Sequence, residues 1–169
     1  LKMNIGSVET VFVKGKVITK YDTVFVDGGT QSINKTWHNF GGGDYVILND
    51  IIVAKQNDKV SLTIQPGVTV KADTSAMLQI AQYVNYNQQY GGELFAVGNS
   101  DSLITFTSRN GLIGGWDGLF FHYNSDSFGS ISELKFCTIQ NGNNYNIKCN
   151  GTLQPRIDSC IINNSNRTT

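Results

Sequence analysis

Charged residues are scarce in this chain, and proline, helical patterns and long apolar runs are scarcer still. Only 15% of the 169 residues are charged, and the 13 basic residues balance the 13 acidic ones. Globular domains usually carry roughly a quarter of charged residues. The zero net charge argues against a nucleic-acid or anionic-membrane partner, because binding to either depends on a basic surface. No apolar run approaches the roughly 20 residues of a membrane-spanning helix, and 2 prolines argue against a disordered chain.

Cysteine is also sparse, with three residues at Cys137, Cys149 and Cys160. An odd number cannot be fully paired within the chain, and the absence of a CxxC pair argues against zinc binding or redox chemistry. We therefore predict buried free thiols, which pack as small hydrophobic residues.

Short β-branched and aromatic runs, broken by Gly, Asn, Asp and Ser, are what the chain has instead. Examples are VFV (24–26), YVIL (45–48), SLTI (61–64) and LITFT (103–107). This pattern is typical of strands and turns, and it predicts an all-β protein in one domain. The segment 75–84 is the one helical alternative, but its flanks favour a strand.

An internal repeat decides between β architectures. One pattern, apolar-x-x-Cys-x-Ile, occurs at the same positions of two ten-residue segments, ELKFCTIQNG (133–142) and RIDSCIINNS (156–165). SLITFTSRNG (102–111) is aligned with the first of them by superposing Asn110 on Asn141. Repeats of several short strands are typical of a β-solenoid, in which each coil buries its apolar side chains only against the next coil. The alternative is a β-sandwich with two accidentally similar strands.

The order of the segments then resembles a known family. YVILNDIIVAKQN (45–57), SLTIQPGVTVKA (61–72), ELFAVGNSDSLITFTS (93–108), GGWDGLFF (114–121) and ELKFCTIQNG follow one another. The series is similar to the opening coils of right-handed parallel β-helix domains of the pectin-lyase-like superfamily, found in secreted and cell-surface bacterial proteins. The Tyr-, Gln- and Asn-rich insert at 81–90 departs from that pattern.

This resemblance implies a right-handed parallel β-helix (a solenoid) of about five coils over residues 37–169. Residues 1–36 lie outside it and are expected to form an N-terminal β cap segment, because an uncapped solenoid end exposes unpaired backbone.

An enzyme of this superfamily, a polysaccharide lyase or a glycoside hydrolase, is the alternative function that the resemblance raises. Such enzymes need clustered or paired carboxylates, and the family's catalytic strings NTD, GHG and RIK are absent. The acids nearest the Trp116 segment are Asp117, Asp126 and Glu133, with Asp101 one coil earlier. Solvated turn residues are the simpler interpretation, so we assign no catalytic residue.

Histidine and metal chemistry find equally little support. His38 and His122 are far apart and lack the companions of a catalytic triad. Acidic turns such as 99–101 and 124–126 carry the oxygen ligands that calcium prefers, but Asx-turns explain them more simply. We assign no metal site and no cofactor, with calcium an unsupported option.

Aromatic residues among polar neighbours are the best candidates for ligand binding, because their rings stack on sugars or dock partners. The resemblance to secreted and cell-surface domains implies a non-catalytic extracellular or cell-surface module for adhesion, scaffolding or assembly, and the sequons agree with secretion. Its expected partner is a glycan or a protein at the cell surface. The binding candidates are Tyr83, Tyr86, Tyr90, Trp116, His122 and Tyr123, and the candidate glycosylation sites are Asn34, Asn150, Asn163 and Asn166.

The C-terminal segment Asn163–Thr169 follows the last apolar strand without a covering element. We therefore expect either further coils or self-association through the solenoid ends, and head-to-tail stacking of unlike ends would give a filament.

Overall fold

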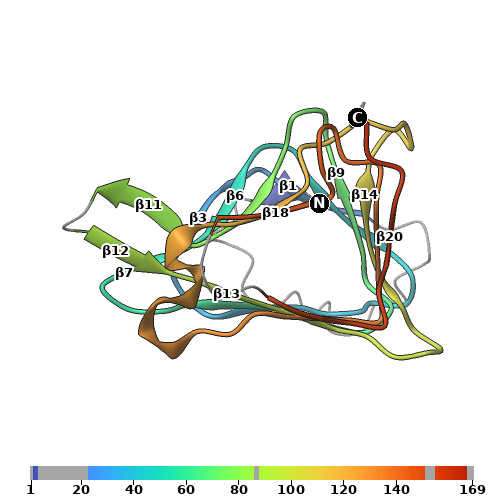
Figure 1. Cartoon of the computed structure of the whole chain (residues 1–169). Helices are drawn as coiled ribbons and strands as arrows, with labels where there is room; N and C mark the ends of the chain where they lie inside the picture. Colours follow the sequence, from blue (N-terminus) through green and yellow to red (C-terminus); the bar gives the residue numbers. More distant parts are fainter. Residues whose placement is uncertain (1, 4–22, 86–87, 151–154, 167–169) are drawn as a thin grey trace.

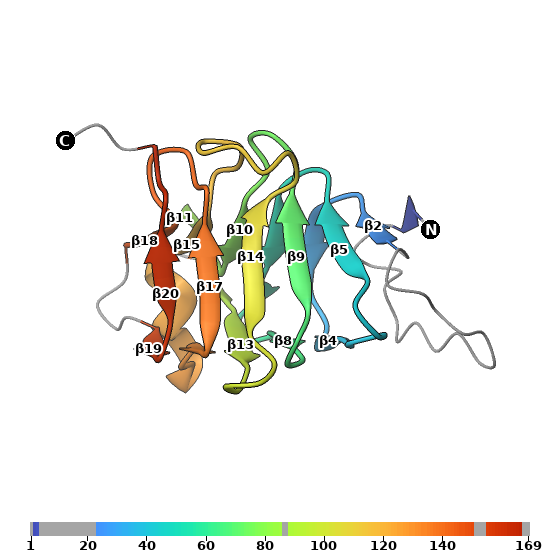
Figure 2. The same ribbon diagram turned by 90° about the vertical axis from the view of Figure 1, so that its right-hand side faces the viewer.

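The computed structural model describes residues 2–3, 23–85, 88–150 and 155–166. Over these residues the protein is all-β, and three parallel sheets face one another around a common interior (Figure 1). Turned by 90°, the same molecule shows the successive strands of one sheet lying side by side along the long direction of the stack (Figure 2).

The largest sheet, here called sheet A, has the strand order β1-β2-β5-β9-β14-β17-β20, and every neighbouring pair is parallel. Its strands are β1 (Lys2–Met3), β2 (Thr23–Val26), β5 (Asp44–Ile47), β9 (Thr69–Ala72), β14 (Ile104–Ser108), β17 (Cys137–Gln140) and β20 (Ile161–Asn163).

Sheets B and C are also parallel and have five strands each. Sheet B consists of β3 (Gly29–Gln31), β6 (Ile51–Val53), β10 (Leu78–Ile80), β15 (Leu119–Phe121) and β18 (Ile147–Cys149). Sheet C consists of β4 (Lys35–Trp37), β8 (Ser61–Ile64), β13 (Glu93–Val97), β16 (Glu133–Lys135) and β19 (Arg156–Asp158).

From β2 to β20 the chain visits the sheets in a constant rotation, A then B then C. Thus β2, β3 and β4 are followed by β5, β6 and β8, and each strand pairs with its counterpart one circuit later. This path confirms the all-β prediction with parallel sheets and is compatible with a β-solenoid.

One ladder of inward side chains runs through sheet A. In register, Tyr45 pairs with Val70, Val70 with Phe106, and Phe106 with Ile139. All four side chains are buried. Burying one such apolar side chain contributes roughly 1.5–3 kcal/mol, so the stacked ladders hold the circuits together.

The strand pairing confirms the repeat between 133–142 and 156–165. Leu134 pairs with Ile157 and Ile139 with Ile162, which sets Cys160 beside Cys137. The shared apolar and Cys-x-Ile positions are therefore equivalent positions of two successive circuits.

The alignment of the preceding repeat through Asn110 and Asn141 is wrong. It would set Phe106 beside Cys137, whereas Ile104 pairs with Cys137 and Phe106 with Ile139. The apolar inward residues set the register, while the Asn-Gly turns used for the alignment vary in length.

Left-handed residues shape the corners between sheets. Phe136 (φ 49°) joins β16 to β17, and Ser159 (φ 53°) occupies the same position one circuit later. Asn141 (φ 66°) and Asn164 (φ 55°) likewise follow β17 and β20. Asn tolerates this region better than most residues because its short amide bonds locally. Repeating a corner conformation at equivalent positions keeps successive circuits in register.

Strands β2, β3 and β4 continue the three sheets toward the N-terminus. The 36/37 boundary drawn from the sequence therefore does not coincide with a change in pairing, since Trp37 in β4 pairs with Ile64 in β8. Most of the segment predicted as a cap, residues 4–22, lies outside the described residues.

The insert at 81–90 leaves the three-sided body as an antiparallel hairpin (Figure 1). Strands β11 (Gln82–Asn85) and β12 (Gln88–Gly91) pair with each other, and β12 pairs with β7 (Lys55–Gln56). A 3₁₀ segment, η2 (Tyr123–Gly129), follows β15 in the next circuit and contacts this hairpin. The segment 75–84 thus contains β10 and most of β11 and no helix, as its flanks predicted.

The ladder predicts a sharp contrast between two adjacent positions of β14. Phe106→Ala removes a fully buried ring between two circuits, and we expect it to lower the free energy of unfolding by about 3–5 kcal/mol. Thr105→Ala, at an outward position, is the matched control and should change it by less than about 0.5 kcal/mol. Urea unfolding measures both, and equal losses would contradict the assigned inward and outward faces.

Candidate functional site

The outer face of sheet B carries a row of side chains that the strand register places side by side. Thr30, Ile52, Gln79, Phe120 and Lys148 are paired in this order across five strands. They alternate with buried neighbours on each of the three central strands, so they point away from the core. Residues from opposite ends of the chain are thereby brought into one line.

Four residues at the C-terminal end of this row form what we call the sheet B patch: Phe120, His122, Tyr145 and Lys148. The Lys148 ammonium nitrogen lies 4.7 Å from the Phe120 ring centroid and 5.4 Å from that of Tyr145. The imidazole of His122 packs on Phe120, with ring centroids 4.0 Å apart and planes inclined by 41°. A cation above two aromatic rings holds all of them in a defined arrangement.

His122 is tied to the row by a polar contact. Its Nε2 lies 3.3 Å from Oε1 of Gln79, and the Gln79 amide donates to Oδ2 of Asp50 at 3.1 Å. Burial lowers the pKa of His122 below its ordinary value of 6.5, and the positive charge of Lys148 lowers it further. The imidazole is therefore neutral at neutral pH, and one ring nitrogen is free to accept a proton or a hydrogen bond.

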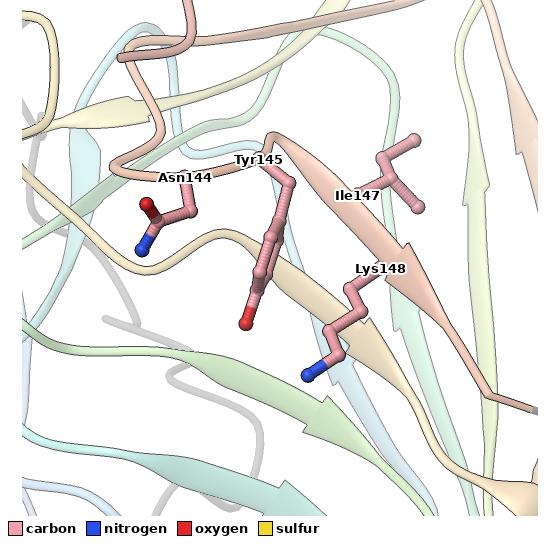
Figure 3. A pocket seen from close by; sticks show the side chains of 4 residues that line it. All are labelled: Asn144, Tyr145, Ile147 and Lys148. Atoms are coloured by element: carbon pink, nitrogen blue, oxygen red, sulfur yellow. The ribbon is translucent and has the colours of Figure 1, made fainter. Parts of the chain in front are cut away.

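A shallow pocket of about 390 Å³ adjoins the patch and is lined by Asn144, Tyr145, Ile147 and Lys148. Figure 3 shows the Asn144 amide, the Tyr145 ring and the Lys148 amine on one side of the segment, with Ile147 extending to the other. The pocket thus combines an aromatic face with amide, hydroxyl and ammonium donors. Such a mixture suits a ligand with both apolar faces and hydroxyl groups.

The residues predicted as ligand contacts are distributed over three environments. His122 is half-buried in the patch, and Tyr123, which starts η2, is exposed. Tyr90 is half-buried in β12, where its backbone pairs with Gln82 and Gln56. Tyr86 and the side chain of Tyr83 lie outside the described residues.

Trp116 is not available to a ligand, contrary to its selection from the sequence. Its side chain is 1% exposed, and its indole N–H donates to the carbonyl oxygen of Gln140 at 2.8 Å. The glycines around it allow the chain to bend over the ring, which places the ring in the core.

Phe120, Tyr145 and Lys148 were missed by sequence reasoning. The available signal was the alternation in GLFF, which turns one phenylalanine outward. The spacing between Phe120 and Lys148 has no counterpart elsewhere in the sheet, so only the strand register identifies them as neighbours.

The acids considered for catalysis occupy different parts of the circuit. Asp101 lies in the turn between β13 and β14, Asp117 lies just before β15, and Glu133 starts β16. Asn99 forms the predicted Asx-turn, its Oδ1 accepting from the backbone N–H of Asp101 at 3.0 Å. The side chain of Asp126 lies outside the described residues. Within the described ranges, no group of three His, Cys, Asp or Glu side chains is placed to hold a metal ion.

The three cysteines are free thiols. Cys137 is buried beside Cys160, as the repeat predicted, and its Sγ–H donates to the carbonyl oxygen of Ala96 at 3.3 Å. Burial, and then the neighbouring Cys160, raise the pKa of the Cys137 thiol to about 12. Burial also raises the pKa of Cys149.

All four asparagines of the sequons lie at exposed positions. Asn34 uses its side-chain oxygen to accept from the N–H of Ser61 at 2.9 Å.

Comparison with known proteins adds no assignment. No protein-family model, curated protein or solved structure matches this chain. In the part of the chain that the structure describes, no helix has the length and apolar character to cross a membrane.

The low pKa of His122 predicts a pH dependence of stability. The unfolded chain binds a proton near pH 6.5 and the folded chain only at lower pH, so stability is complete above 6.5 and falls as the pH drops through the folded pKa. Lys148→Met should raise the pKa of His122 by removing the positive charge, while Lys71→Met, on strand β9 of sheet A, should not. An NMR titration of the imidazole protons measures both, and an unchanged pKa in Lys148→Met would contradict the contact.

The raised pKa of Cys137 predicts selective alkylation. At about pH 8 the thiolate, which is the reactive form, is almost absent from this site. Iodoacetamide should therefore leave Cys137 unmodified in the folded protein and modify all three cysteines in urea. Peptide mass spectrometry distinguishes the sites, and rapid labelling of folded Cys137 would show that it is accessible.

Proposed function

We propose that this protein is a right-handed parallel β-helix of the pectin-lyase-like type. Three findings support the proposal: the constant rotation through three parallel sheets, the in-register inward ladders and the matching corner conformations. The order of segments that resembles this superfamily supports it independently.

Within that fold the protein acts as a non-catalytic extracellular or cell-surface module that contacts glycans. The single observation behind this function is the sheet B patch with its adjoining pocket. Phe120 and Tyr145 offer flat apolar faces, and Asn144 and Lys148 offer donors beside them. The exposed sequons and the low content of charge agree with an extracellular location.

An enzyme of the lyase or hydrolase type remains the alternative, and no particular arrangement of residues favours it. Retaining and inverting glycosidases need two carboxyl groups on either side of one bond. The described acids from the sequence analysis instead lie at separate corners or in a different sheet from the patch.

The test measures binding of the 169-residue chain to an array of neutral and uronate-containing polysaccharides. Phe120→Ala and Tyr145→Ala should each weaken binding about 2- to 10-fold, because an aromatic contact contributes about 0.5–1.5 kcal/mol. Phe95→Ala is the matched control, since Phe95 is a half-buried outward residue on sheet C. Tyr90→Ala tests whether the hairpin takes part.

Two results would overturn the proposal. Equal losses in Phe120→Ala and Phe95→Ala would show that binding does not use the patch. Unsaturated or reducing ends appearing in the incubated polysaccharides would show an enzyme.

A further inference from the structure

The two ends of the stack differ in how well their inward side chains are covered. At the N-terminal end, Val26 and Trp37 are both 0% exposed. At the C-terminal end, the equivalent inward residues Ile157 and Ile162 are 45% and 47% exposed, although Leu134 and Ile139 beneath them are fully buried. Within the described residues, the end of the stack formed by β18, β19 and β20 therefore presents a face of half-exposed apolar side chains. These three strands lie at the same end of the molecule in Figure 2.

Three edge strands surround this face. β18, β19 and β20 end sheets B, C and A, and within the described residues each pairs with a strand on one side only. Such edges offer unpaired N–H and C=O groups, which readily accept a strand from another chain. Apolar side chains and free backbone groups thus occur together on one surface.

The middle edge strand is complementary to itself. β19 reads Arg156-Ile157-Asp158, with Ile157 inward and the two charged residues exposed on the outer face. If two copies of β19 pair antiparallel about Ile157, Arg156 of each copy lies opposite Asp158 of the other. Residues directly opposite in an antiparallel pair share a face, and opposite charges stabilise the pair.

The rise of the chain along the stack decides which of the three edge strands the two-fold axis can pass through. Each circuit rises by about one strand spacing of roughly 4.8 Å, so along the last circuit β18 is lowest, β19 midway and β20 highest. A two-fold axis through β19 exchanges β18 with β20, and all three strand pairs then meet at equal spacing. With an axis through β18 or through β20, at least one pair of facing strands would lie about two strand spacings apart instead of one, too far to hydrogen-bond.

We propose that the 169-residue chain forms a two-fold dimer through the three strands that end its sheets, with β19 pairing antiparallel to β19 of a second copy and β20 pairing to β18. The dimer covers Ile157 and Ile162 of both copies and extends all three sheets. Because the interface joins two identical ends, it closes at two subunits. Head-to-tail filaments, which the sequence suggested, are the competing assembly, and growth beyond two subunits distinguishes them from the dimer. This proposal rests on the strand pairing and is independent of glycan binding.

The experiment uses two single charge reversals in the 169-residue chain. In Arg156→Asp, four acidic residues meet at the interface of two like copies, and in Asp158→Arg four basic residues meet. Each variant alone should dissociate about tenfold more readily than the wild type, because like charges directly opposite are destabilising. Mixed in equal amounts, the two variants should form a heterodimer, since both charge pairs are then complementary.

Sedimentation equilibrium measures the homodimers, and native mass spectrometry identifies the heterodimer by its mass. Lys55→Asp, an exposed reversal in another part of the chain, is the control and should dimerise like the wild type. Thermal unfolding confirms that each variant is folded, so a loss of dimer is not a loss of structure.

Three outcomes would overturn the proposal. A wild-type chain that stays monomeric at its highest soluble concentration would exclude the dimer. Assemblies that grow beyond two subunits would indicate stacking of unlike ends. Homodimers of both variants that persist without forming the heterodimer would exclude pairing through β19.

Discussion

The stacking of each inward side chain on its equivalent one circuit away is the interaction on which this structure depends. The ladder Tyr45–Val70–Phe106–Ile139 is continuous although the number of residues between successive members differs, and it is largest between Val70 and Phe106. A slip of one residue would turn every side chain of a strand to the opposite face. Register is therefore under strict control by the core, whereas the turns tolerate insertions as large as the β11–β12 hairpin.

The same register that builds the core also builds the outer surface. Because inward positions are fixed, the alternate positions of each strand must line up outside, and Phe120 is held between Gln79 and Lys148. The interior needs apolar side chains, but the outer row is free to vary. Function on such a body is accordingly expected on an outer face or at an insertion rather than in the interior.

The ends of the stack follow from the same dependence on neighbouring circuits. A strand with a neighbour on one side only leaves half of its backbone groups and part of its inward side chain uncovered. Ile162 illustrates the effect, since it occupies the position of Ile139 and is 47% exposed where Ile139 is fully buried. Such an end is covered by a surface whose strands pair with its edge strands and whose apolar side chains contact its inward side chains. A second copy of the same end is such a surface.

The sequence by itself determined the strands, the inward pattern and the repeat that joins Cys137 to Cys160, because alternation and repeated Cys-x-Ile positions are local properties. It misaligned the preceding repeat and named the buried Trp116 as a ligand contact, because turn length and glycine content do not reveal which side of a corner a ring occupies. Only the tertiary structure decided which outward residues meet. Lys148 reaches Phe120 because the intervening chain, which includes β16 and β17, completes one circuit. The register of that circuit pairs Leu119 with Ile147 and Phe121 with Cys149.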